Sequence, residues 1–207
     1  MDSKTLQRAF TFEMRAANDE KNGDHITGRP IVYDSKTDLG YFDEIIERGA
    51  LDKTNLKDVR FLVNHNTDMI PLARSRNNNE NSTMQMEVDK DGMAIRVNLD
   101  TENNSDARNL YSAIKRGDIT GMSFMFSIND EEWEDLDSDH PTRHIKEIGQ
   151  VLEVSAVTFP AYESTEISAR DKEALDSAKA TLDSVRSTLD SEHEALELEK
   201  AKLLALY

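Results

Sequence analysis

Three polar residues interrupt short apolar runs that otherwise alternate like β-strands: His65, Ser123 and Glu153. A histidine, a serine and a carboxylate are the three side chains with which serine hydrolases activate a hydroxyl for attack on a carbonyl group. A polar group inside an apolar strand costs free energy unless a hydrogen bond satisfies it. Each of the three is therefore a candidate catalytic residue.

His65 ends a run with the alternation of a half-buried strand. A period of two places Val59, Phe61, Val63 and His65 on one face, so the imidazole continues an apolar stripe. Taken alone, a histidine in such a position is more often a structural residue whose hydrogen bonds are satisfied than a catalytic one. The pattern favours catalysis only in combination with the other two residues.

Ser123 lies in a second strand-like run. Met122, Phe124 and Phe126 define one face, while Gly121 and Ser123 belong to the other. Serine is common in half-exposed strands, so this run alone does not distinguish a nucleophile from a surface residue. The alternative nucleophile is one alternation step further along the same face, at Ser127.

Glu153 is the most informative of the three, because its run, Val151–Phe159, is apolar on both faces. A carboxylate there must be hydrogen-bonded or paired, and orienting a histidine is one way to achieve this. A salt bridge to an arginine such as Arg74 is the competing interpretation. The substitute acids, if Glu153 is not the partner of the histidine, are Asp68, Asp118 and Glu163.

The elements that position these residues are mostly strands. We expect strands at residues 10–14, 26–33, 59–65, 84–88, 93–99, 122–128 and 151–159. Asp89–Gly92 predicts a hairpin turn. Helices are expected at Phe42–Leu51 and at Ser105–Arg116, and the acidic segment Asn129–Arg143 is expected to be an exposed loop. This pattern predicts an α+β fold with a β-rich barrel or sandwich and a few helices.

The composition changes near residue 170 to Ala, Leu, Glu, Asp, Ser and Lys, without Gly or Pro. We expect a domain at 1–170 and one long helix at 171–207. Leucine recurs every seventh residue from Leu175 to Leu203, which is typical of a helix that packs against a partner helix. A solvated amphipathic tail without a partner is the alternative.

Composition excludes several classes of function. The 207-residue chain carries a net charge of −16, which disfavours nucleic acids and anionic membranes as partners. It has no cysteine, so thiolate nucleophiles and disulfides are excluded. We expect no cofactor and no metal, because His140 and His144 have helical ligand spacing but flank Pro141 in an expected loop. Without a signal sequence or an apolar spanning run, the chain is expected to be soluble and intracellular.

Five segments, in this order and with this spacing, resemble the prohead proteases of tailed bacteriophages, whose fold is similar to that of herpesvirus assemblins. They cover much of residues 8–170 and are Ile26–Asp34, Gly40–Leu51, Val59–Asn66, Ile114–Phe126 and Leu152–Tyr162. The resemblance implies a β-barrel-like catalytic domain and a serine endopeptidase. It also implies that His65 is the general base, Ser123 the nucleophile and Glu153 the third member of the triad.

By the same resemblance, the enzyme acts in the host cytoplasm inside the assembling procapsid. There it would cleave scaffold or major capsid protein, and also itself. The leucine repeat separately indicates that residues 171–207 bind scaffold or a second copy. A non-catalytic assembly adaptor is the alternative function, and a small-molecule serine esterase is disfavoured because no Gly-x-Ser-x-Gly motif surrounds Ser123. Arg74 and Arg170 are candidate oxyanion donors.

Overall fold

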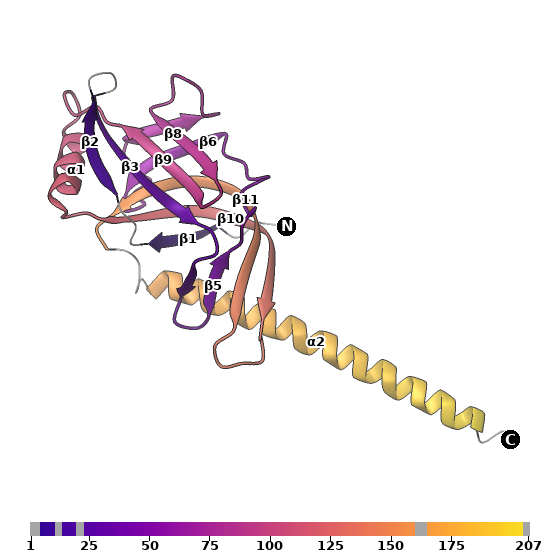
Figure 1. The fold of residues 1–207 in the computed structure, drawn as a ribbon. Helices are drawn as coiled ribbons and strands as arrows, with labels where there is room; N and C mark the ends of the chain where they lie inside the picture. Colours follow the sequence, from indigo (N-terminus) through magenta and orange to yellow (C-terminus); the bar gives the residue numbers. More distant parts are fainter. Residues whose placement is uncertain (1–4, 11–13, 20–22, 160–164, 205–207) are drawn as a thin grey trace.

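The computed structural model describes residues 5–10, 14–19, 23–159 and 165–204. These residues form two sheets and two helices (Figure 1). The larger sheet contains β1 (Thr5–Phe10), β4 (Lys36–Asp38), β5 (Asp43–Ile46), β6 (Asp58–Val63), β7 (Ala73–Arg76), β10 (Gly121–Glu134) and β11 (Thr142–Val157). The smaller sheet contains β2 (Arg15–Asp19), β3 (Gly23–Val32), β8 (Met84–Asp89) and β9 (Gly92–Asn98), and the helices are α1 (Ser105–Arg116) and α2 (Thr165–Leu204).

The long antiparallel hairpin of β10 and β11 is the centre of the larger sheet. β1 pairs with the other edge of β10. The edge of β11 that faces away from β10 pairs in parallel with two strands. The beginning of β11 pairs with β5, and the end of β11 pairs with β6. β6 therefore ends beside the last residues of β11, and β1 lies beside the first residues of β10. Both arrangements position the candidate site.

The apolar core fills the space between the two sheets. Large side chains on one face of β10, Met122, Phe124 and Phe126, are fully buried, as is Phe61 of β6. These residues occupy the alternate positions that their sequence pattern predicts for a strand with one buried face. Burial of this kind stabilises by about 1.5–3 kcal/mol for each large apolar side chain.

The helix expected at Ser105–Arg116 is confirmed. The Asn104 side chain accepts hydrogen bonds from the backbone amides of Asp106 and Ala107, at 2.9 and 3.3 Å. At the other end, Gly117 has φ 80°, the left-handed conformation that commonly ends helices. The hairpin expected at Asp89–Gly92 is also present, between β8 and β9.

Two expected elements were wrong. Residues 42–51 do not form a helix: Asp43–Ile46 is strand β5, with buried and part-exposed side chains alternating, because it adds to the edge of β11.

The segment expected as an exposed loop, Asn129–Arg143, is mostly strand. β10 continues to Glu134 and β11 begins at Thr142. Ion pairs join the two strands there, between Arg143 and Glu131 and between Lys146 and Glu132. Trp133 packs edge-on against Phe42, with the ring centroids 4.8 Å apart.

Other strand predictions need smaller changes. The strand expected at 10–14 lies partly outside the described residues, and β1 ends at Phe10. The expected α+β class is confirmed, whereas the pairing recorded among the described strands leaves two separate sheets and no closed barrel.

The long helix α2 begins at Thr165, before the composition changes at Asp171. Asp171 and Leu175 are buried, and Asp171 binds Arg8 of β1 in the larger sheet, while Val185, Leu189 and Leu196 are at least half exposed. α2 then extends away from the sheets (Figure 1). The division into 1–170 and 171–207 stays a prediction. None of the described helices is long and apolar enough to cross a membrane.

Candidate active site

His65 lies in a tight turn directly after β6, rather than at the end of the strand. Asn64 and His65 both have left-handed φ angles, 52° and 55°. Such angles are uncommon for residues with a side chain, although Asn and His adopt them more readily than most. The turn moves the imidazole out of the apolar stripe in which strand alternation had placed it.

Hydrogen bonds to β11 and the residues after it hold this turn. The Asn64 backbone amide donates to the Ala156 carbonyl at 2.9 Å. The Asn64 side-chain amide donates to the Thr158 hydroxyl at 3.0 Å and accepts from the Thr158 backbone amide at 2.9 Å. These bonds stabilise a conformation that would otherwise cost of order 1–3 kcal/mol. The position of His65 is therefore fixed relative to β11.

The imidazole of His65 contacts the carboxylate of Glu153 directly. Nδ1 of the ring is hydrogen-bonded to Oε1 of Glu153. The Glu153 side chain is 5% exposed and that of His65 is 17% exposed. Since an ionised carboxylate only accepts hydrogen bonds, this contact places the ring proton on Nδ1 and leaves Nε2 as the basic nitrogen.

A further residue completes this pair, and sequence reasoning missed it. The Ser155 hydroxyl donates to Oε2 of Glu153 at 2.6 Å and accepts from the backbone amide of His65 at 3.1 Å. Ser155 is fully buried. A signal was available, because Ser155 follows Glu153 by two positions and so lies on the same face of the strand.

Ser123 lies on the neighbouring strand, on the same face of the sheet. It is directly opposite Ser155 in the β10–β11 register, and directly opposed residues of antiparallel strands share a face. Ser123 is 1% exposed. Its hydroxyl donates to the backbone carbonyl of Arg8, in β1, at 2.8 Å. The structure thus brings His65 and Glu153 into contact and places Ser123 one strand away, with its proton directed to Arg8.

The substitute residues that the structure describes lie elsewhere. The β10–β11 pairing shifts between Met125 and Phe126, which places Ser127 opposite Gln150 and out of the Ser123 register. Asp118 is ion-paired with Arg116, Asp68 is exposed in a turn, and Glu163 is outside the described residues.

Arg74, the arginine named as the competing partner, does not bind Glu153. Arg74 makes two hydrogen bonds, at 2.6 and 2.8 Å, to the exposed side chain of Asp58. The side chain of Arg170 is outside the described part of the chain. The partners that the structure records for the Glu153 carboxylate are His65 and Ser155. These contacts favour the orienting role over a salt bridge to Arg74.

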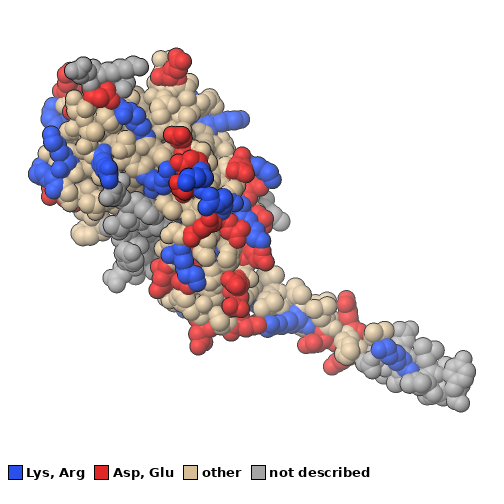
Figure 2. Space-filling view, in the orientation of Figure 1, with Lys and Arg blue, Asp and Glu red and all other residues tan. Residues whose placement is uncertain are grey.

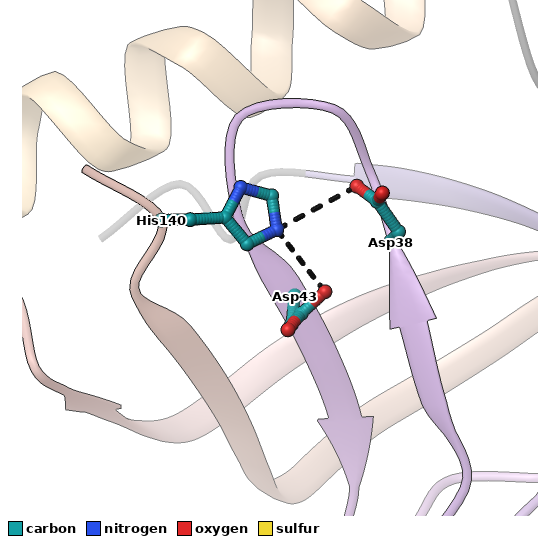
Figure 3. Close-up of side chains that lie close together, drawn as sticks. All are labelled: Asp38, Asp43 and His140. Atoms are coloured by element: carbon teal, nitrogen blue, oxygen red, sulfur yellow. Dashed lines mark hydrogen bonds and ion pairs between the residues drawn. The ribbon is translucent and has the colours of Figure 1, made fainter. Parts of the chain in front are cut away.

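His140 and His144 do not converge on one point. His144 lies between two glutamates: its Nδ1 is 3.1 Å from the Glu47 carboxylate, and its Nε2 is 3.2 Å from the Glu134 carboxylate. His140 instead approaches Asp43 at 3.1 Å and Asp38 at 3.6 Å (Figure 3). The ammonium group of Lys36 already binds Asp43, at 2.9 Å, and this hydrogen bond lowers the pKa of Asp43. These contacts tie the connection between β10 and β11 to the β4–β5 hairpin.

Comparison with known proteins places the chain in a family. The profile of the caudovirus prohead serine proteases matches residues 10–179, which include His65, Ser123, Glu153 and Ser155. Among solved structures, the bacteriophage T4 capsid assembly protease, gp21, is similar, with 13% identity and a TM-score of 0.48; the match covers 77% of this chain and 100% of that one. No curated protein matches the sequence. Because the family profile matches most of the length of the chain, the chain belongs to the caudovirus prohead serine protease family.

Proposed function

We propose that this prohead serine protease hydrolyses peptide bonds with Ser123 as nucleophile, His65 as general base and Glu153 as the residue that orients His65. The observation that carries the assignment is the hydrogen-bonded pair of His65 and Glu153 on the sheet face that Ser123 shares. A buried carboxylate satisfied by an imidazole and a hydroxyl is costly to assemble and has no evident structural need. This pair also argues against the non-catalytic adaptor.

The proposed reaction has two halves. The Ser123 oxygen attacks the substrate carbonyl carbon while Nε2 of His65 takes the hydroxyl proton. His65 then gives that proton to the leaving amine as the peptide bond breaks. Water hydrolyses the acyl-enzyme in the same way, with His65 again acting as the base. Throughout, Glu153 keeps Nδ1 protonated and stabilises the charged imidazolium.

The substrates that suit a prohead protease are proteins of the assembling shell. We propose scaffold protein, or a scaffold-like segment of the major capsid protein, cleaved inside the procapsid in the host cytoplasm. Two exposed apolar residues one turn apart on α2, Val185 and Leu189, support binding of a helical scaffold segment through this helix. Tethering would raise the local substrate concentration to around the millimolar range. On the face shown in Figure 2, basic and acidic side chains are intermixed.

Two measurements test the assignment. A fluorophosphonate probe should label the wild type at Ser123 and should not label Ser123→Ala. Ser127→Ala, a buried serine on the same strand, is the matched control and should label normally. On co-expression with the phage capsid and scaffold proteins, mass spectrometry of their termini should show cleavage by the wild type. Ser123→Ala, His65→Ala and the double variant should all be inactive to a similar degree, because the two residues act as a unit. Processing at a normal rate by Ser123→Ala would refute the proposal.

A further inference from the structure

The strand β1 lies where a peptide substrate would be expected to pair. It forms the edge of the larger sheet, antiparallel to β10, with Ala9 opposite Ser123 and Arg8 opposite Phe124. Extended peptides commonly bind proteins by adding a strand to a sheet edge, where backbone hydrogen bonds hold them. The edge of β10 beside the nucleophile is such an edge, and the protein's own β1 occupies it (Figure 1).

The hydrogen bond of Ser123 shows what this occupant does to the nucleophile. A serine hydroxyl has one proton, and here the Arg8 carbonyl accepts it at 2.8 Å. General-base catalysis requires the same proton to be donated to His65. With β1 in place, Ser123 is therefore in a resting arrangement, and the carbonyl that accepts its hydrogen bond belongs to an arginine.

The side chain of that arginine is anchored in a buried acidic site. Nε and Nη2 of Arg8 bind the two carboxylate oxygens of Glu44, and Nη2 also binds Asp171 in α2 at 2.9 Å. All three side chains are 2% exposed. Burial lowers the pKa of the guanidinium, but the charges and hydrogen bonds of Glu44 and Asp171 outweigh burial and raise it. Arg8 thus contacts the nucleophile through its backbone and α2 through its side chain.

Removing β1 would leave Glu44 and Asp171 buried without this cation. A buried charge that loses its partner costs about 3–5 kcal/mol. Arg143, the neighbouring cation, lies 3.5 Å from Glu44 but makes its hydrogen bonds to Glu131, so it does not replace the hydrogen bonds that Arg8 makes. An incoming positive side chain is the simplest replacement. An exchange in which one arginine-bearing strand replaces another preserves both the backbone pairing and the ion pairs.

We propose that β1 is a removable occupant of a peptide-binding edge on β10, and that Glu44 and Asp171 form an arginine subsite of that edge. The inference rests on the proposed function and names its substrate class: extended peptides with an arginine whose carbonyl lies against Ser123. Binding of such a peptide displaces β1 and brings the peptide's own arginine carbonyl to Ser123 in place of the Arg8 carbonyl.

The test measures the rate at which a fluorophosphonate probe labels Ser123 in the full chain. Arg8→Gln should loosen β1 and label faster than wild type by about tenfold or more, because the Glu44 and Asp171 carboxylates lose the charge-assisted hydrogen bonds of Arg8. Arg8→Lys keeps the charge but loses the bidentate contact with Glu44, so its labelling rate should lie between those of wild type and Arg8→Gln. The control is Arg29→Gln, which removes a bidentate pair with Asp89 at 2.6 Å in the smaller sheet and should change nothing.

A synthetic peptide of residues 4–10, Lys-Thr-Leu-Gln-Arg-Ala-Phe, tests the subsite itself. Added to Arg8→Gln, it should slow labelling saturably, and the same peptide with citrulline in place of arginine should not. If Arg8→Gln does not fold, a chain lacking residues 1–10 receives the same two peptides. Wild-type labelling rates in folded Arg8→Gln, or equal effects of the two peptides, would overturn the inference. Failure of the probe to label Ser123 in every form of the protein would instead refute the proposed function.

Discussion

The carboxylate of Glu153 and Nδ1 of His65 are hydrogen-bonded across the parallel pair of β11 and β6, although 88 positions separate the two residues in the chain. The contact depends on the left-handed turn at Asn64 and His65, since a strand continued through His65 would keep the side-chain alternation of β6. The pairing of β11 with β6 and the turn at Asn64 and His65 therefore determine which ring nitrogen of His65 carries the proton.

Glu153→Gln should fold and should reduce the rate of peptide cleavage by about ten-thousand-fold, as happens when a triad acid is neutralised. The amide nitrogen of glutamine can donate to Nδ1, which favours the wrong tautomer of His65. Single-turnover cleavage of a capsid-derived peptide measures the effect. Glu147→Gln, on the same strand but hydrogen-bonded to Asn129 and Lys53, is the control and should keep wild-type activity. An active Glu153→Gln would mean that another acid orients His65.

Ser155→Ala should reduce kcat by about tenfold to a hundredfold and leave KM nearly unchanged. The hydroxyl donates to the Glu153 carboxylate at 2.6 Å, and a hydrogen bond to a charged group contributes about 1.5–3 kcal/mol. Its loss frees Glu153 and the His65 backbone amide to move, while substrate contacts remain.

Ser75→Ala is the matched control for Ser155→Ala. Ser75 is equally buried, in β7, but its hydroxyl is recorded without a hydrogen-bond partner. Its removal should leave kcat unchanged. If the two alanine variants behave alike, Ser155 contributes packing alone and does not position the catalytic pair.

The sequence predicted the strands that carry the site better than it predicted their edges. Alternation identified most of β6, the first half of β10 and the second half of β11, because each has one or two apolar faces. Residues 43–46 were mistaken for helix because four residues are too few to show a period, and their strand conformation comes from pairing with β11.

The turn at His65 and the role of Ser155 could not follow from alternation alone. Asn64 and Asn66 flank His65 and are typical of turns. The left-handed conformation of Asn64 and His65, however, depends on hydrogen bonds to residues that lie far along the chain. The Arg8 cluster was missed for the same reason, since Arg8, Glu44 and Asp171 come from three elements widely separated in the sequence.

Asp171→Asn should stabilise the protein at neutral pH, and the advantage should disappear in acid. Burial raises the pKa of the Asp171 carboxyl and the charge of Glu44 raises it further, against the opposing effects of Arg8 and Arg143. Because the pKa is higher in the folded than in the unfolded state, folding is favoured while Asp171 is protonated. That stability is lost as the pH rises through the folded-state pKa.

Thermal unfolding of the wild type and of Asp171→Asn, measured from acid to neutral pH, tests this prediction. The two melting temperatures should converge in acid, where a protonated Asp171 resembles asparagine, and separate towards neutral pH with the variant higher. Asp176→Asn, an exposed aspartate on the same helix, is the control and should show no such divergence. A wild type that is more stable than Asp171→Asn at neutral pH would show that the Arg8 ion pair outweighs the cost of burying the charge.

Truncation of α2 should separate its buried start from its exposed remainder. A chain ending at Ala178 keeps Asp171 and Leu175 and should retain the full-length melting temperature and the full-length rate of probe labelling. A chain ending at Arg170 loses both buried side chains and should be less stable, by about 1.5–3 kcal/mol for Leu175 alone.

The exposed remainder of α2 should matter for delivery to the substrate rather than for chemistry. Val185→Lys with Leu189→Lys places two charges on the apolar stripe while keeping good helix formers, so probe labelling should be unchanged and incorporation into procapsids should fall. Ser184→Lys with Ser187→Lys adds the same charge on other faces of the helix and should be incorporated normally. Equal incorporation of both double variants, measured on purified procapsids, would contradict a role for the stripe. Equal loss would indicate that added charge, and not the apolar contact, prevents entry.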